Sequence, residues 1–224
     1  MNSQSKVSGK DFWEQRYISL CMPWDIGQAA PPFVKYLTKC FSQKTTATLN
    51  VAVLGSGRGH DAFYFAKYKE CNFNVYCFDF SDSAIKYCNE LKEKDNIQNV
   101  VFHKEDFFKL TQDKRWESFF DLVIEHTSLA AIDPKRREEY ANLISYILKP
   151  GGNLVGLFFV RPKELGGPPF GITPDEVRLL FQKDFIEIEE LHSEECLHGE
   201  KLKGKEYFGV FEKKQNFHKS EPIP

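Results

Sequence analysis

The 224-residue sequence lacks the features that mark several large classes of protein. Its first residues, MNSQSKVSGKDFWEQRY, contain no apolar stretch of the kind found in a secretory signal. The longest apolar stretch, around residues 154–160, is far shorter than a membrane-spanning helix. There is no basic excess either, because 30 Lys and Arg stand against 32 Asp and Glu, a formal net charge of −2. We therefore expect neither nucleic acid nor a membrane as a partner.

Cysteine is sparse and unpaired in the sequence. The six cysteines form no Cys-x-x-Cys pair and lie near no histidine cluster, so we predict no metal site. Scattered cysteines in a chain of this length are typical of buried free thiols in a reducing compartment, and we expect a cytoplasmic protein. Hydrophobic residues make up 42% and charged residues 28%, which excludes a largely disordered chain and a fibrous one.

Strand-like and helix-like segments alternate along the middle of the chain, and this alternation is the main indication of the fold. Continuous apolar runs are expected where helices cover both faces of a parallel sheet. Such runs predict buried parallel strands at residues 48–54, 73–80, 100–103, 120–125 and 153–160. Helical patterns lie between them at residues 61–69, after the N-cap Ser81, and at residues 136–148.

Two further segments, residues 185–191 and 206–212, alternate in part and predict an antiparallel edge; a helix is predicted at residues 175–181. The pattern predicts an α/β fold: a Rossmann-like, doubly wound, seven-stranded and mostly parallel sheet with an antiparallel edge and helices on both faces. No repeat or linker divides the chain, so we expect one domain over residues 1–224. Residues 1–45 lie outside the alternation and predict an N-terminal helical extension.

The first predicted strand ends in a glycine-rich turn, Gly55-Ser56-Gly57-Arg58-Gly59, where the backbone can come close to a nucleotide. In the dinucleotide fingerprint Gly-x-Gly-x-x-Gly, the third glycine would fall at position 60, which is His60. The turn fits dinucleotides poorly and is similar instead to the Gly-x-Gly-x-Gly turn of Rossmann-like S-adenosylmethionine-dependent methyltransferases. That resemblance implies that Gly55, Ser56 and Gly57 cradle the amino-acid end of the cofactor.

The ends of the next two strands are expected to supply further cofactor contacts. Asp79, with Phe80 after it, ends the second strand, where a carboxylate can accept both ribose hydroxyls. Asp106 and Phe107 follow the third strand and would flank the adenine, with core packing as an equal alternative for Phe107. Lys149-Pro150-Gly151-Gly152, which is common in this class before the fifth strand, predicts a helix stop and a tight turn.

The segment after the fourth strand narrows the class of acceptor. It reads Glu125-His126-Thr127-Ser128, and no Asn/Asp-Pro-Pro-Tyr motif occurs there. That motif supports methylation of an exocyclic amine on a base. Its absence speaks against amine methylation of DNA or RNA and agrees with the charge balance.

Four stretches carry a more specific likeness, and they span roughly residues 12–182. They are Phe12-Trp13-Glu14-Gln15-Arg16-Tyr17 with Pro23-Trp24-Asp25-Ile26-Gly27; Leu54-Gly55-Ser56-Gly57-Arg58-Gly59-His60-Asp61; Ala130-Ala131-Ile132-Asp133-Pro134 with Arg137 and Tyr140; and Gly167-Pro168-Pro169-Phe170. Together they resemble the thiopurine and thiol S-methyltransferase family, which includes plant halide/thiol methyltransferases. The first and third stretches are specific, because methyltransferases in general lack them.

The resemblance implies that N-terminal aromatic residues close over the cofactor, here Trp13, Tyr17 and Trp24. Aromatic faces suit a sulfonium through cation–π attraction; an amphipathic helix packed on the sheet is the alternative. The residue after the fourth strand is Tyr or Arg in relatives and contacts the cofactor. Here it is His126, whose two interpretations are a general base and an orienting or structural residue. Some relatives have Cys where this chain has Ala130, so no role that needs a thiol there is expected.

The sequence therefore predicts a methyltransferase that uses S-adenosylmethionine to methylate the sulfur of a small thiol or thiopurine-like acceptor by in-line displacement. We expect it to work as a monomer or weak dimer. Three alternatives stay open: a methyltransferase for a halide, metalloid, oxygen or nitrogen acceptor; an NAD-dependent dehydrogenase, which His60 opposes; and a catalytically silent cofactor-binding module. The acceptor itself is not predicted, since acceptor pockets in this family lie in its variable parts.

Overall fold

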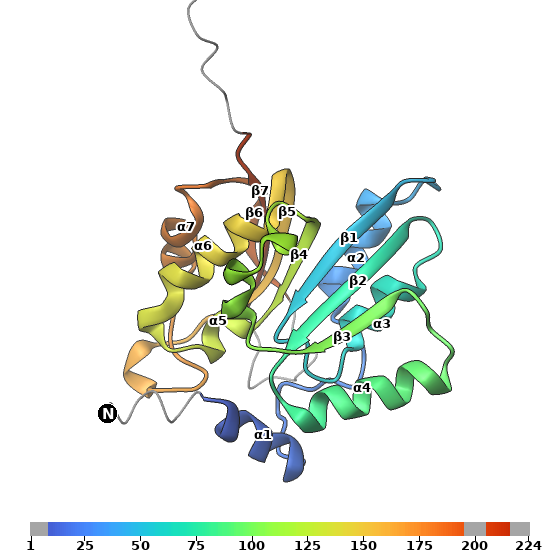
Figure 1. Cartoon of the computed structure of the whole chain (residues 1–224). Coiled ribbons are helices and arrows are strands. Elements are labelled where there is room, and N and C mark those ends of the chain that lie inside the picture. The colour runs from blue at the N-terminus through green and yellow to red at the C-terminus, as the bar shows by residue number, and fades with distance from the viewer. Residues whose placement is uncertain (1–8, 195–204, 216–224) are drawn as a thin grey trace, which may run out of the picture.

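The computed structural model describes residues 9–194 and 205–215, and within them the strands form one seven-stranded sheet in the order β3-β2-β1-β4-β5-β7-β6 (Figure 1). The strands β3, β2, β1, β4 and β5 are each parallel to the next strand in this order. Strand β7 pairs antiparallel with both β5 and β6. The strands are β1 (Thr48–Leu54), β2 (Asn72–Asp79), β3 (Val100–Lys104), β4 (Phe120–His126), β5 (Leu148–Phe159), β6 (Phe185–Glu194) and β7 (Glu206–Lys213). The predicted mostly parallel sheet with an antiparallel edge is confirmed.

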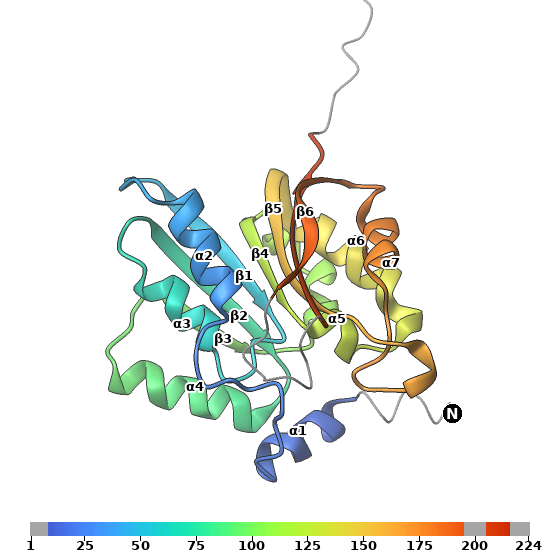
Figure 2. The same ribbon diagram turned by 180° about the vertical axis from the view of Figure 1, so that it is seen from behind.

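Helices cover both faces of this sheet, as Figures 1 and 2 show. One face carries α2 (Pro31–Cys40), α3 (His60–Lys67) and α4 (Asp82–Lys94), and the other carries α6 (Arg137–Ile147) and α7 (Pro174–Phe181). Two shorter helical segments, η2 (Phe107–Gln112) and α5 (Ser128–Ala131), follow β3 and β4. Helix α1 (Lys10–Ile18) lies outside the two layers, against the start of α4 and at the end of the sheet to which β1, β2 and β3 point (Figure 1).

The two faces of the sheet have separate cores, and this explains the continuous apolar runs. Val51 and Val53 of β1 pack with Phe65 under α3 on one face, whereas Ala52 and Leu54 pack with the other core, under α6. Each apolar residue along the strand is thus buried on one side or the other. Full burial of side chains of this kind contributes roughly 1.5–3 kcal/mol each.

One expectation about the loops of the fold needs correction. The segment Lys149-Pro150-Gly151-Gly152 does follow a helix stop, but it is not a tight turn: it lies inside β5 as an irregularity where the pairing with β4 changes register. Gly151 has φ +77°, which is the backbone freedom that this bulge requires. The predicted N-terminal helical extension is present as α1 and α2, and Phe33 and Leu37 of α2 are completely buried in the core.

Five cysteines lie in the described residues, and all are free: Cys71, Cys77 and Cys88 are buried, whereas Cys21 and Cys40 are exposed. Cys196 lies outside the described residues. Over the same part of the chain, no helix has the length and apolar character needed to cross a membrane.

Candidate active site

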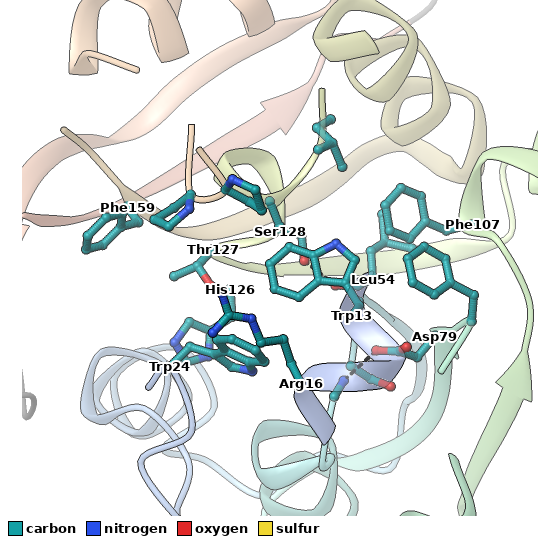
Figure 3. A pocket seen from close by; sticks show the side chains of 18 of the residues that line it. Trp13, Arg16, Trp24, Leu54, Asp79, Phe107, His126, Thr127, Ser128 and Phe159 are labelled. Carbon is teal, nitrogen blue, oxygen red and sulfur yellow. Dashed lines mark hydrogen bonds between the residues drawn. The ribbon is translucent and has the colours of Figure 1, made fainter. Parts of the chain in front are cut away.

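A cavity of about 1000 Å³ opens at the carboxyl ends of the parallel strands. It lies beside the boundary between β1 and β4. There the order in which strands are added changes from one edge of the sheet to the other, and open α/β folds usually bind their ligands at this point. In Figure 3, Asp79 and Phe107 lie together on one side, His126, Thr127 and Phe159 lie toward the other, and Trp13 lies between them. We call these two parts of the cavity the Asp79 end and the His126 end.

The glycine turn forms the floor of the Asp79 end, and all three of its glycines have positive φ. A Cβ on Gly57 would come within 2.8 Å of the Tyr17 hydroxyl, and one on Gly55 within 2.6 Å of Ser128 Oγ. Side chains are therefore excluded at both positions by conformation and by space. The buried hydroxyl of Ser56 has no hydrogen-bond partner within the described chain, so a polar donor or acceptor from a ligand would satisfy it.

Asp79 ends β2 and is 8% exposed. Its Oδ2 accepts the backbone N–H of Gly57 at 2.9 Å, and its Oδ1 accepts that of Ser81 at 2.8 Å. Burial raises the pKa of Asp79, and these backbone donors oppose the shift. A carboxylate oxygen can accept more than one hydrogen bond, so both retain capacity for a pair of neighbouring hydroxyls. Phe80, predicted with Asp79, also lines the cavity.

Asp106 and Phe107 line the same end but have structural roles as well. Asp106 Oδ1 accepts the backbone N–H of Phe108 at 3.1 Å and thereby caps η2. Phe107 is 6% exposed and packs against Tyr140, with 5.4 Å between ring centroids. The two interpretations offered for Phe107 are therefore compatible, because the ring packs in the core while the residue also borders the cavity.

The three N-terminal aromatic residues form a cluster over the cavity. The rings of Trp13 and Trp24 meet edge to face at 5.2 Å between centroids, and those of Tyr17 and Trp24 at 6.0 Å. Trp13 and Tyr17 both belong to helix α1. Glu14 of the same helix holds it to the start of α4. The Glu14 carboxylate accepts the hydroxyl of Ser81 at 2.7 Å and that of Ser83 at 2.5 Å.

His126, the last residue of β4, lies on the wall of the cavity next to Asp61 from α3. Its Nδ1 is 2.7 Å from Asp61 Oδ2. Burial alone would lower the pKa of His126, but the charge and hydrogen bond of Asp61, with the charges of Glu206 and Glu125, raise it. Asp61 is the last residue of the second of the four sequence stretches. Nothing in the spacing of that stretch indicated that Asp61 contacts a residue 65 positions away.

A second carboxylate–histidine pair involves His60, the residue that stands where a dinucleotide-binding turn has its third glycine. His60 Nε2 lies 2.8 Å from Asp25 Oδ1, and Arg58 Nη1 lies 3.4 Å from the other oxygen of Asp25. The first and second of the four stretches found in the sequence thus meet through these side chains. Their joint presence in the sequence is the signal that could have indicated this contact.

Glu125 was not predicted as a functional residue. It is completely buried, its Oε1 accepts the backbone N–H of Leu129 at 2.5 Å, and its Oε2 has no partner in the described part of the chain. Burial raises the pKa of Glu125 to about 7, against the opposing effect of the Leu129 N–H. This carboxyl group holds α5, and α5 supplies part of the wall at the His126 end.

The third and fourth stretches also meet, at the His126 end of the cavity. The backbone N–H of Phe170 donates to the Ala130 carbonyl at 2.6 Å, and Arg137 Nη2 donates to the Phe170 carbonyl at 3.2 Å. Arg161 Nη1 donates to the Pro169 carbonyl at 3.1 Å. The loop that contains Pro168 and Pro169 is thereby fixed beside the cavity that it lines.

The geometry fits S-adenosylmethionine: a buried acceptor for a ribose diol, an unsatisfied hydroxyl and a side-chain-free turn lie at one end of the cavity, under aromatic rings. Solved structures agree on the fold. The Burkholderia thailandensis 1,6-didemethyltoxoflavin-N1-methyltransferase, with bound 1,6-didemethyltoxoflavin and S-adenosylhomocysteine, is 18% identical with a TM-score of 0.72, over 95% of this chain and 90% of that one.

Sequence relatives are closer. A "probable thiol methyltransferase 2" of Arabidopsis thaliana is 28% identical over 92% of this chain and 86% of that protein. "Thiocyanate methyltransferase 1" of the same plant is 30% identical over 80% and 75%, respectively. A thiopurine S-methyltransferase of Vibrio campbellii is 30% identical over 46% of each chain.

The family model described as "Thiopurine S-methyltransferase (TPMT)" matches residues 8–220, almost the whole chain. The predicted cofactor, S-adenosylmethionine, and the predicted enzyme class are thereby confirmed: the protein is an S-adenosylmethionine-dependent methyltransferase with a small-molecule substrate. The chain belongs to the thiopurine S-methyltransferase family.

Proposed function

We propose that this enzyme methylates the sulfur of a small thiol at the His126 end of the cavity. The observation that carries the proposal is the arrangement of one cavity with two unlike ends: a carboxylate and glycine turn at the Asp79 end, and a histidine bonded to a carboxylate at the other. The names of the relatives, thiol, thiocyanate and thiopurine methyltransferases, support a sulfur acceptor.

At the Asp79 end, the proposed role of the chain is to hold and cover the cofactor. Asp79 would accept the ribose hydroxyls, Gly55, Ser56 and Gly57 would border the amino-acid end, and Phe80, Asp106 and Phe107 would border the adenine. When bound, S-adenosylmethionine supplies an electrophilic methyl group on a sulfonium. Trp13, Tyr17 and Trp24, in the extension formed by residues 1–45, would cover it and exclude water.

At the His126 end, the chain orients the acceptor. A thiol of pKa near ~8.5 is already a good nucleophile, so the protein needs to align it and keep it dry more than to activate it. Alignment of two reactants in one site lowers a barrier by roughly 7–11 kcal/mol. Phe159, Pro168 and Pro169 give this end an apolar wall, and His126 gives it a polar group. His126 is the residue that we propose touches the acceptor.

The test is an acceptor panel with the purified chain and S-adenosylmethionine. We expect micromolar cofactor binding by calorimetry, no response to NADH, and methyl thioether formation by mass spectrometry with small thiols or a thiopurine. Methylation of iodide, an oxygen or a nitrogen compound in preference to every thiol would contradict the sulfur acceptor. Tight cofactor binding without turnover on any acceptor would favour a silent binding module instead.

We further propose that the protein works in the cytoplasm as a monomer or weak dimer, without a nucleic acid or a membrane. Its charge balance speaks against nucleic acid, its lack of a long apolar stretch speaks against a membrane, and its scattered free cysteines agree with a reducing compartment. Size-exclusion chromatography with light scattering at two concentrations measures the oligomeric state, and a stable higher oligomer would contradict it.

A further inference from the structure

His126 and Asp61 form a closely bonded pair that a backbone N–H of the N-terminal segment helps to hold in place. The Nδ1 atom of His126 lies 2.7 Å from Asp61 Oδ2. The other oxygen, Oδ1, accepts the backbone N–H of Ala30 at 2.8 Å. Both carboxylate oxygens are thus engaged, one by the chain that leads from α1 to α2 and one by the ring. The side chain of Asp61 is only 10% exposed, so water competes little for these bonds.

The hydrogen bond to Asp61 determines which ring nitrogen is available. A carboxylate accepts hydrogen bonds, so Nδ1 of His126 carries a proton and donates it. The ring of Phe33 packs edge to face against the imidazole, with 5.6 Å between centroids, and restricts its rotation. Nε2 remains: it makes no hydrogen bond within residues 9–194 and 205–215, while the side chain lines the cavity and is 19% exposed.

Acidic groups face this ring from three elements of the fold. They are Asp61 on α3, Glu206 at the start of β7 and Glu125, the neighbour of His126 on β4. Burial opposes protonation of the ring, but together these carboxyl groups raise the pKa of His126. Lys205, which directly precedes β7, is a basic residue that also lines the cavity. The environment therefore favours an imidazolium whose second N–H is the available donor.

We propose that Asp61 is a positioning residue for the transfer: it orients His126 so that Nε2 faces the acceptor and holds its sulfur as an anion. This inference rests on the proposed function. A neutral thiol gives its proton to Nε2 of a neutral ring; the S–H bond breaks, an N–H bond forms, and the electron pair stays on sulfur. An acceptor that is already anionic meets the imidazolium directly. Both routes end in the same ion pair, which the carboxylate of Asp61 stabilises.

The first measurement is the titration of His126 by ¹⁵N–¹H NMR of its imidazole in the full chain, without any acceptor. We expect Asp61→Asn to lower the titration midpoint of His126 by roughly 1–3 pH units, because it removes an opposite charge in direct contact. Asp25→Asn is the matched control, since Asp25 forms the neighbouring carboxylate–histidine pair with His60 at 2.8 Å. It should leave the midpoint of His126 in place. An unchanged midpoint in Asp61→Asn would overturn the proposal.

The second measurement uses sodium thiocyanate, a soft sulfur anion whose charge does not vary with pH over the range studied. We expect the wild-type protein to bind it at least about tenfold more tightly at pH 6 than at pH 9, because only the imidazolium donates from Nε2. The pH difference should vanish in His126→Gln and shrink in Asp61→Asn. If His126→Gln keeps the pH difference, Nε2 does not hold the anion and the inference fails.

These two readouts separate the inference from the proposed function. A wild-type protein that methylates no thiol would contradict the proposed function, yet the titration and the thiocyanate linkage would still show whether Asp61 controls His126. Conversely, thiol methylation with an unshifted His126 in Asp61→Asn would leave the proposed function standing and remove the role of Asp61. Asp61→Glu, which keeps the charge, should restore part of the wild-type midpoint.

Discussion

At the Asp79 end of the cavity, contacts come from strand ends and backbone; at the His126 end, they come from side chains far apart in the sequence. Asp79 and the glycine turn meet across two adjacent strands, through the Gly57 N–H. His126, by contrast, is bonded to Asp61 and feels the charge of Glu206, and the loop fixed by Arg161 lines the same cavity. The contact at the Asp79 end follows from the pairing of adjacent strands, whereas the contacts at the His126 end need side chains from several different elements.

This difference assigns separate physical tasks to the two ends. The Asp79 end relies on shape and on hydrogen-bond acceptors, which suit a ligand that is always the same. The His126 end holds several titratable groups in contact, and their ionisation depends on one another. We therefore expect substitutions at the first end to change cofactor affinity, and those at the second to change pH dependence.

The largest effect is expected at Asp79. In Asp79→Asn, one acceptor oxygen becomes an amide nitrogen that faces either the Gly57 or the Ser81 N–H, and the negative charge is lost. Each hydrogen bond to a charged group contributes roughly 1.5–3 kcal/mol, so the dissociation constant of S-adenosylmethionine should rise roughly 100-fold or more. Calorimetric titration measures it.

Asp106→Asn is the control for that substitution. Its remaining oxygen can still accept the Phe108 N–H and cap η2, so we expect a rise of about tenfold or less. Equal losses in both variants would mean that the Asp79 end does not depend on one carboxylate, and the contrast between the two ends would weaken.

An effect of comparable size, on stability rather than affinity, is expected at Glu125. Its pKa of about 7 in the folded chain exceeds the ordinary 4.5, so the folded state holds a proton that the unfolded state has lost between these values. The stability contributed by the neutral carboxyl is full below pH 4.5 and is lost as the pH rises through about 7. Glu125→Gln should then stabilise the protein by roughly 2–3 kcal/mol at pH 8 and leave it nearly unchanged at pH 4.5.

Urea unfolding of both proteins across that pH range measures the difference. A gain that is the same at every pH would show that the amide packs better, not that Glu125 titrates. A loss at pH 8 would mean that the ionised carboxylate is stabilised by His126 or by the α5 backbone, and that the pKa of Glu125 is not raised.

The contrast between the two ends also explains what could be predicted from the sequence. Gly55, Gly57 and Asp79 lie at strand ends, where β-pattern and motif spacing indicate position directly. The contact between Asp61 and His126 joins α3 to β4, and depends on the order in which strands pair, β1 beside β4, which periodicity does not give. The bulge at Gly151 was missed for a similar reason, because it exists only relative to the neighbouring strand.

The smallest effects are expected in α1, which lines the cavity with Trp13 and Tyr17 and is held by two kinds of contact. Glu14 accepts hydrogen bonds from Ser81 and Ser83, and these donors lower its pKa although burial opposes them. Lys10 pairs with Asp82 at 2.9 Å, but both side chains are about half exposed. Exposed ion pairs contribute little, so helix docking should depend on Glu14.

We expect Glu14→Gln to raise the dissociation constant of S-adenosylmethionine by about fivefold, since loss of one or two charge-assisted hydrogen bonds loosens the helix that carries Trp13 and Tyr17. Lys10→Ala should leave the constant unchanged within error. Tryptophan fluorescence on cofactor addition gives a second readout of closure in both variants. If Lys10→Ala weakens binding as much as Glu14→Gln, α1 is held by general charge attraction, and its cover over the cavity would then loosen with added salt.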